Sequence, residues 1–153
     1  MSSRNQSLPK ELSYGVTIHV RDTCLCLHLQ RAARAVARRF DEALRPVGLT
    51  NGQFSLLMSL NRPEPPTIGS VASLLAMDRT TLTAALKPLE RRGLVKVMVD
   101  AADKRNRRLV LTAAGRTRLT AALPIWTSTH AAVERGLPRE DADGLREDLR
   151  ALS

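Results

Sequence analysis

The chain has few aromatic residues and no long apolar run. Its 153 residues include two Phe, one Tyr and one Trp. Proteins that bind single-stranded nucleic acid by base stacking need several aromatic side chains, so this composition disfavours that mode of binding. No stretch of about 18 apolar residues is present, and the polar residues 1–6 lack the apolar core of a signal peptide. We therefore expect a cytoplasmic protein that does not enter a membrane.

The residues that build catalytic and metal sites are also scarce. The two cysteines, Cys24 and Cys26, are one residue apart, which does not suit the disulfide framework of a secreted domain. The three histidines are scattered, no glycine-rich phosphate loop occurs, and these groups fall short of a four-ligand zinc site. We expect no enzymatic activity, no metal and no cofactor.

Basic charge is abundant and unevenly distributed. The chain has 24 Lys and Arg against 15 Asp and Glu, a net charge of +9. Residues 79–108 hold nine basic and three acidic side chains, whereas residues 113–153 hold six of each. Clustered basic charge favours a polyanionic partner, because contacts with phosphates release condensed counterions. A solvated basic surface would give the same count, so the charge indicates recognition only if a suitable scaffold carries it.

Apolar periodicity and cap residues predict a mainly α chain with a small β-wing (α+β). Residues 1–20 are weakly patterned and are expected to form a flexible arm. A capping box is expected at Thr50 and Gln53, an N-cap at Asp78, and a kink at Pro124 within a long helix. The expected helices cover 22–47, 50–62, 69–75, 79–92, a long segment from Thr112 and a last segment opened by Pro138; the expected strands cover 94–99 and 107–111.

The helix expected at 79–92 has a buried stripe and a polar face. Leu82, Leu86 and Leu89 fall on one side of the helical wheel. The outer face is small, hydroxylated and basic, which allows a helix to lie close in a DNA major groove. The candidate DNA-binding residues of this helix are Arg79, Thr80, Thr81, Thr83, Ala84, Lys87 and Arg91, with Thr80, Thr83, Ala84 and Lys87 as the groove-reading set.

A charged loop joins the two expected strands. Lys104, Arg105, Arg107 and Arg108 lie there near two carboxylates, those of Asp100 and Asp103. Carboxylates at the base of such a hairpin can hold one guanidinium while another reaches a minor groove. We take Asp103, Lys104, Arg105 and Arg107 as candidate DNA-binding residues of this wing. The order of helix, turn, helix and basic hairpin is that of a winged helix-turn-helix.

Several segments resemble the bacterial MarR family of transcriptional regulators. Residues 79–96 resemble its recognition helix and first wing strand, and residues 100–105 resemble its wing motif, with Ala101 in place of the usual proline and Lys104 in place of an arginine. Residues 111–115 match its Leu-Thr-x-x-Gly ending. The resemblance implies a domain over 21–153, with a winged core at about 50–112 and dimerisation helices at about 22–47 and 113–152. It also implies that an ion pair between Asp103 and Arg105 shapes the wing.

The resemblance implies a homodimer that binds double-stranded DNA at a pseudo-palindromic operator, with half-sites about 10 bp apart. The charge-neutral segment 113–153 is expected to form the dimer surface, with the leucines Leu119, Leu123, Leu145, Leu149 and Leu152. Members of the family usually repress genes and are released by a small ligand. We therefore expect a homodimeric repressor released by an aromatic or anionic effector, for which His28 and Arg31 are candidate binding residues.

Two alternatives stay open at this point. Cys26 occupies what resembles the position of the reactive cysteine in organic-hydroperoxide sensors of the family, which makes Cys26, with Cys24, a candidate redox site. The tyrosines that hold the thiolate in those sensors are replaced here by Gln30 and Phe40, and a disulfide between Cys24 and Cys26 would require a helix to unwind. A protein of another class, a non-specific architectural DNA binder, would share the basic charge but discriminate little between sequences.

Overall fold

The computed structural model describes residues 12–153, so the part of the expected arm at 1–11 lies outside the described residues. The chain divides within one helix into two compact units, the first ending at Val36 and the second running from Ala37 to Ser153. The elements in chain order are α1 (Tyr14–Thr23), α2 (Leu25–Leu44), the 3-10 helix η1 (Arg45–Val47), α3 (Asn51–Ser59), α4 (Ile68–Leu74), α5 (Arg79–Arg91), β1 (Val95–Val99), β2 (Arg107–Leu111), α6 (Ala113–Arg135) and α7 (Ala142–Ala151).

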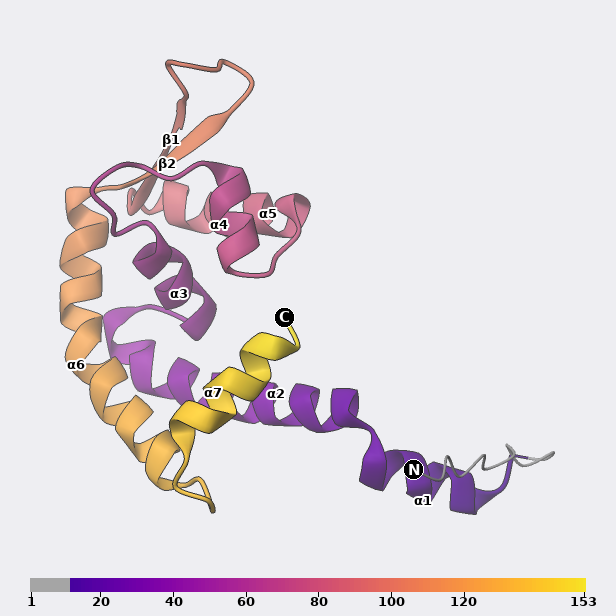
Figure 1. Ribbon diagram of the computed structural model, residues 1–153. Coiled ribbons are helices and arrows are strands. Elements are labelled where there is room, and N and C mark those ends of the chain that lie inside the picture. Colours follow the sequence, from indigo (N-terminus) through magenta and orange to yellow (C-terminus); the bar gives the residue numbers. More distant parts are fainter. Residues whose placement is uncertain (1–11) are drawn as a thin grey trace. The chain divides into compact units, whose positions relative to one another are not determined.

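The apolar core lies in the second unit. Helices α3, α4, α5 and α6 and the two strands contribute to one cluster, in which α3 contacts α4 and α6, and α5 contacts α4 and β1 (Figure 1). The buried stripe predicted for α5 is confirmed, since Leu82, Leu86 and Leu89 are almost completely buried. The fully buried leucine and valine side chains of the cluster are Leu44, Leu57, Leu82, Leu86, Leu89, Leu109 and Val71. Leu119 of α6 also lies in this core, which corrects its expected place on the dimer surface.

The helix starts follow the predicted cap residues. Thr50 and Gln53 form the expected capping box, with the Thr50 hydroxyl accepting from the backbone N–H of Gln53 and the Gln53 side chain accepting from the N–H of Thr50. Simple N-caps start two other helices: the Asp78 carboxylate accepts from the N–H of Thr81 in α5, and the Thr112 hydroxyl accepts from the N–H of Gly115 in α6. These side chains satisfy N–H groups that have no partner within the helix, which fixes where each helix begins.

The wing is a two-stranded antiparallel hairpin. Val95 lies opposite Leu111 and Val99 lies opposite Arg107, so the loop from Asp100 to Asn106 forms its tip. The hairpin extends away from α4 and α5 of the same unit in Figure 1. An isolated bridge pairs Thr67 with Arg108 and attaches the second strand to the segment before α4.

The helices at the two ends of the chain differ from the sequence-based expectation. The first helix does not begin at Asp22: residues 14–23 already form α1, the chain leaves the helical conformation at Cys24, and α2 begins at Leu25. The last helix does not begin at Pro138, because the N-cap is Asp141, whose carboxylate accepts from the N–H of Gly144. Pro124, by contrast, lies inside the long helix α6 as expected.

None of the helices described here combines the length and the apolar character needed to cross a membrane.

Candidate DNA-binding surface and adjoining cavity

The outer face of α5 is open to solvent. Every residue that we selected from this helix is exposed: Arg79, Thr80, Thr81, Thr83, Ala84, Lys87 and Arg91. The opposite face is anchored by the three buried leucines, so the exposed side is held in one orientation relative to the core. The small side chains at Thr80 and Ala84 leave room for another surface to approach the helix backbone closely.

Two of the threonine hydroxyls already have hydrogen-bond acceptors. Thr81 Oγ1 donates to Asp78 Oδ2 at 2.7 Å, and Thr83 Oγ1 donates to the carbonyl oxygen of Arg79 at 2.8 Å. The hydroxyl of Thr81 and its backbone N–H both stabilise the Asp78 carboxylate, which lowers the pKa of Asp78. Thr81 and Thr83 therefore present their methyl groups and oxygen lone pairs to a partner, whereas the hydroxyl of Thr80 forms no hydrogen bond within residues 12–153.

Arg79 lies close to α4. A Cβ added to Gly69 would be 3.4 Å from Nη2 of Arg79, so the guanidinium passes over the one residue of α4 that has no side chain. Arg79 also lies at the first position of α5, next to the N-cap Asp78. Its positive charge is thereby placed at the edge shared by the two helices.

An ion pair fixes the base of the wing. Nη2 of Arg108 lies 3.1 Å from Oδ2 of Asp100, and Nη1 of the same guanidinium donates to the carbonyl oxygen of Pro65 at 2.8 Å. Asp100 is buried, and its other oxygen accepts from the N–H of Ala102. A carboxylate at the wing base thus holds one guanidinium, as the sequence suggested.

The expectation of an ion pair between Asp103 and Arg105 is wrong for this chain. Asp103 instead accepts from the backbone N–H of Arg105 at 3.0 Å, which closes the turn at the tip, and no carboxylate in residues 12–153 lies within ion-pair distance of the Arg105 guanidinium. Arg107 donates to the carbonyl oxygen of Lys104. Hydrogen bonds made by Asp103 and Arg107 therefore shape the tip of the wing. The charged side chains of Lys104 and Arg105 are left available to a partner.

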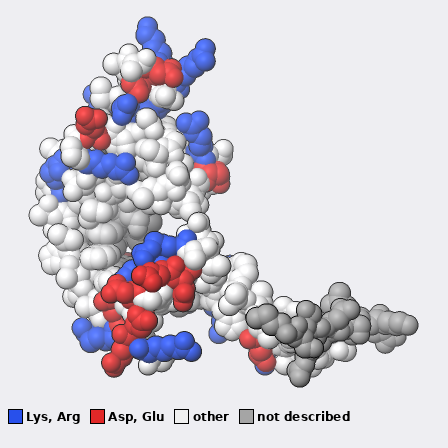
Figure 2. All heavy atoms as spheres, viewed as in Figure 1, with Lys and Arg blue, Asp and Glu red and all other residues white. Residues whose placement is uncertain are grey.

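Basic side chains gather at the end of the wing, with acidic side chains beside them (Figure 2). The second unit of the chain thus carries an exposed polar helix face and a basic hairpin on one folded core. The sequence identified these residues because their character follows from local periodicity and from the charged loop.

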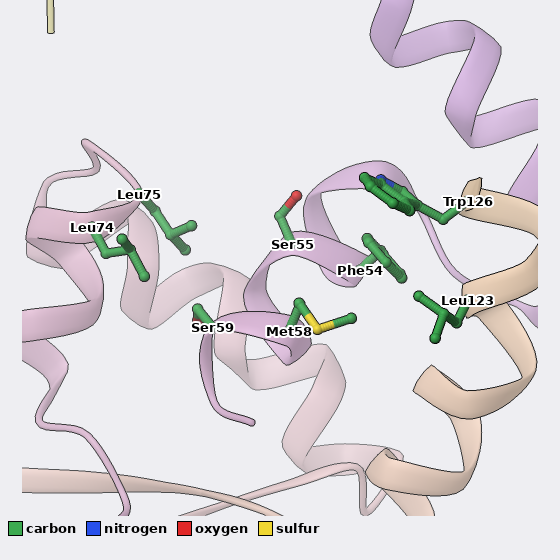
Figure 3. A pocket seen from close by; sticks show the side chains of 8 residues that line it. All are labelled: Phe54, Ser55, Met58, Ser59, Leu74, Leu75, Leu123 and Trp126. Carbon is green, nitrogen blue, oxygen red and sulfur yellow. The ribbon is translucent and has the colours of Figure 1, made fainter. Parts of the chain in front are cut away.

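An apolar cavity of about 580 Å³ adjoins α3. The end of α4 lies on one side of it and α6 on the other, with α3 between them (Figure 3). No lining residue is charged, and the only lining hydroxyls are those of two serines. The lining residues are Phe54, Ser55, Met58, Ser59, Leu74, Leu75, Leu123 and Trp126.

A stack of rings forms one wall of this cavity. The rings of Phe54 and Trp126 are nearly parallel, with their centroids 6.1 Å apart, and the His130 ring stacks on Trp126 with a centroid distance of 4.7 Å. His130 Nε2 lies 3.6 Å from Glu134, which in turn pairs with Arg146 of α7 at 2.6 Å. No local pattern in the sequence indicates this cavity, because its residues come from three helices. The only local signal was the single tryptophan.

The candidate effector and redox residues lie in the first unit. His28 and Arg31 are exposed and do not belong to the lining of the cavity beside α3. Cys24 separates α1 from α2, with extended backbone angles, and Cys26 is exposed in the first turn of α2. The helix is therefore already interrupted at Cys24. Nε2 of Gln30 donates to the Cys26 sulfur at 3.1 Å.

No group of three or more His, Cys, Asp or Glu side chains in residues 12–153 is arranged to hold a metal ion.

Comparison with known proteins connects this geometry to a family. The MarR family model matches residues 49–106. The Mycobacterium tuberculosis transcriptional regulator MosR, in complex with DNA, has 40% sequence identity and a TM-score of 0.77, over 84% of this chain and 92% of that chain. The transcriptional repressor CouR, bound to a 23-mer DNA duplex, has 30% identity and a TM-score of 0.76, over 93% of this chain and 98% of that chain. CouR from Rhodococcus jostii is also known bound to p-coumaroyl-CoA.

A curated relative is also a transcriptional regulator. The regulator SarZ of Staphylococcus haemolyticus is 32% identical over 91 residues, which are 60% of this chain and 62% of SarZ. The match thus spans less than two thirds of that relative, whereas the two solved structures are covered almost completely. The motifs, the winged core and these similarities agree, and the chain belongs to the MarR family of transcriptional regulators.

Proposed function

We propose that the chain is a homodimeric repressor that binds double-stranded DNA with sequence specificity. The observation that carries this proposal is the presence, on one core, of an exposed face of α5 and a basic wing. Thr80, Thr83, Ala84 and Lys87 would read the major groove, with Arg79 and Arg91 beside them, and Lys104 and Arg105 would reach the minor groove. The DNA complexes of MosR and CouR support this assignment.

Fluorescence anisotropy tests the specificity. The labelled duplex is the DNA immediately upstream of the protein's own gene, and the control is a scrambled duplex of the same composition. A regulator should prefer its site by roughly 10³-fold or more at physiological salt. Equal affinity for both duplexes, with a steep dependence on salt, would instead identify a non-specific architectural binder.

We further propose that a small aromatic ligand enters the cavity beside α3 and releases the DNA. The apolar lining, the ring stack of Phe54 and Trp126 and the volume of about 580 Å³ support a ligand with at least one aromatic ring. The complex of CouR with p-coumaroyl-CoA supports ligand control in a relative. Since the lining is uncharged, the cavity itself favours a neutral ring system, and His28 and Arg31 remain the candidates for an anionic group.

A matched pair of ligands separates these two contributions. 2-Naphthamide and 2-naphthoate differ mainly in charge, and each is titrated into the protein by calorimetry and into the protein–DNA complex by anisotropy. Tighter binding of the amide that Met58→Trp blocks would support the cavity as the site. Tighter binding of the carboxylate that Arg31→Ala abolishes would assign the effector to the first unit instead.

A thiol switch is the second candidate. The interruption of the helix at Cys24 and the exposure of Cys26 beside Gln30 favour it. In this reaction the Cys26 thiolate attacks the distal oxygen of an organic hydroperoxide, which gives a sulfenic acid and an alcohol. Condensation with the Cys24 thiol then gives a disulfide and water. Loss of DNA binding on oxidation, recovery with dithiothreitol and insensitivity of Cys26→Ser would support it; binding indifferent to the hydroperoxide would exclude it.

A further inference from the structure

Two arginine side chains from distant elements converge on the turn before α3. Nη1 of Arg118, in α6, donates to the carbonyl oxygen of Val47 at 2.8 Å. Nη2 of Arg92, the C-cap residue of α5, donates to the carbonyl oxygen of Gly48 at 2.8 Å. The same turn is thereby bonded to the C-terminal end of α5 and to the second turn of α6.

The turn is flanked by buried residues. Leu44 and Leu49, which flank it, are 0% and 3% exposed. Gly48 has a φ of 67°, and a Cβ at this position would be 3.1 Å from Arg118 Nη1 and 3.3 Å from Arg92 Nη2. Both guanidinium groups therefore lie close to the Cα of Gly48. A side chain at this position would obstruct their approach.

These arginines do not serve to neutralise acidic side chains. Within residues 12–153, neither guanidinium has a carboxylate within ion-pair distance. Two like charges held side by side repel each other, so their hydrogen bonds to the two neighbouring carbonyls are what keep them together. Their hydrogen bonds thus connect α5 and α6 to the same turn.

A connection at this end of α5 controls the direction of the whole helix. Its 13 residues give a length of about 20 Å, so a tilt of about 10° at one end displaces the other end by about 3 Å. The candidate base-reading residues lie toward the N-terminal end, and hydrogen bonds to bases tolerate displacements of much less than this.

We propose that Arg92 and Arg118 form a clamp on the Val47–Gly48 turn that sets the orientation of α5 for DNA recognition. Both are positioning residues and neither contacts the DNA. This inference rests on the proposed function, because it concerns how the same helix is held for its groove.

The test compares DNA affinity with the salt dependence of that affinity. Arg92→Met is assayed by anisotropy on the upstream duplex across a series of salt concentrations, with the dimer checked by sedimentation. Specific binding should weaken about tenfold, the magnitude typical of residues that act through others. The slope of log affinity against log salt should stay unchanged, because no phosphate contact is removed.

Two further variants test whether the effect of Arg92→Met comes from loss of the clamp. Gly48→Asn keeps every charge but places a Cβ against both guanidiniums, and asparagine accepts the left-handed conformation better than most residues. It should show the same loss of affinity at the same slope. Arg135→Met removes an exposed arginine from the last turn of α6 and should bind like the wild type.

Three results would overturn the clamp. A slope lowered by about 1 in Arg92→Met would make Arg92 a phosphate contact. Wild-type affinity combined with a lower melting temperature would make the hydrogen bond merely structural. Wild-type affinity of Gly48→Asn would show that the approach to Gly48 is irrelevant. If the wild type itself shows no preference for the upstream duplex, the proposed function fails, which is distinct from any of these results.

Discussion

Asp100 and Arg108 join the base of the wing to the segment before α4. Their carboxylate and guanidinium are 3.1 Å apart, and the same guanidinium bonds the carbonyl oxygen of Pro65, 43 residues away in sequence. The side chain of Asp100 is 9% exposed and that of Arg108 is 37% exposed, so solvent screens this pair only in part. The hairpin is therefore anchored at its base while its tip stays in solvent.

Removing the charge of Asp100 should loosen this anchor. We expect Asp100→Asn to lower the free energy of unfolding by about 1 kcal/mol, because the guanidinium of Arg108 loses its charged acceptor. Urea denaturation measures this change. Asp103→Asn, at the exposed tip, is the matched substitution and should have a smaller effect on stability. Equal effects of the two substitutions would contradict the anchoring role.

Arg105 tests the contact that the wing tip makes with DNA. Arg105→Ala should weaken binding and lower the salt slope by about 1, because one phosphate or minor-groove contact is lost. Anisotropy across a salt series measures both quantities, and sedimentation should find the dimer intact. Normal affinity at physiological salt would contradict the assignment of the wing.

Leu149 tests the dimer surface. Leu145, Leu149 and Leu152 of the C-terminal segment are 42%, 40% and 63% exposed in the single chain. Leu149→Asp should convert a dimer into monomers, because a carboxylate buried in an apolar interface lacks a partner. Sedimentation velocity measures the change. Glu147→Lys, on another side of α7, should leave the sedimentation coefficient unchanged; an unchanged coefficient for Leu149→Asp would count against this surface.

Gly115 tests the closing residue of the Leu-Thr-x-x-Gly segment. A Cβ at this position would collide with the backbone carbonyl of Leu94 and lie 2.7 Å from Cδ1 of Leu111. Gly115→Ala should therefore destabilise the fold by about 2–3 kcal/mol. Gly52→Ala is the matched control, because a Cβ there meets nothing within 4 Å, and it should stabilise α3 slightly. Thermal denaturation of the two variants should show shifts of opposite sign.

Asp41 should give stability a dependence on acid pH. Its Oδ1 accepts from the backbone N–H of Asn51 at 2.7 Å and from the Asn51 side chain at 2.9 Å, and these bonds lower the pKa of Asp41. Because the pKa is lower in the folded state, the stabilisation is complete above the unfolded pKa of about 3.9 and is lost as the pH falls through the folded value.

Urea denaturation between about pH 3 and pH 6 measures this contribution. Asp41→Asn keeps an oxygen acceptor without a charge and should flatten the part of the pH dependence that Asp41 supplies. Identical curves for Asp41→Asn and the wild type would contradict the role of this carboxylate.

Local signals explain what the sequence predicted. Thr50, Asp78 and Thr112 were identifiable as caps because their side chains act on N–H groups two or three residues away. The buried stripe of α5 follows from a period of 3.6 residues, and the hairpin follows from two β-branched runs around a charged loop. The exposed candidate residues of α5 and the wing were found for the same reason.

What depends on distant contacts was missed or misplaced. Asp100 and Asp103 have the same chemistry, and only the register of the hairpin and the position of Pro65 decide which one meets an arginine. The cavity brings together three helices, so no segment of the sequence indicates it. The break at Cys24 has neither a proline nor a glycine to mark it.

The ring stack at the cavity also has an optical consequence. Trp126 is the only tryptophan of the chain, and it lies between the cavity and the imidazole of His130. All indole emission from this protein therefore originates at one wall of the proposed ligand site. A ligand that enters the cavity would contact this ring, so the emission intensity reports on occupancy of the cavity. The molecule thus carries its own spectroscopic reporter at the place where control of DNA binding is proposed to begin.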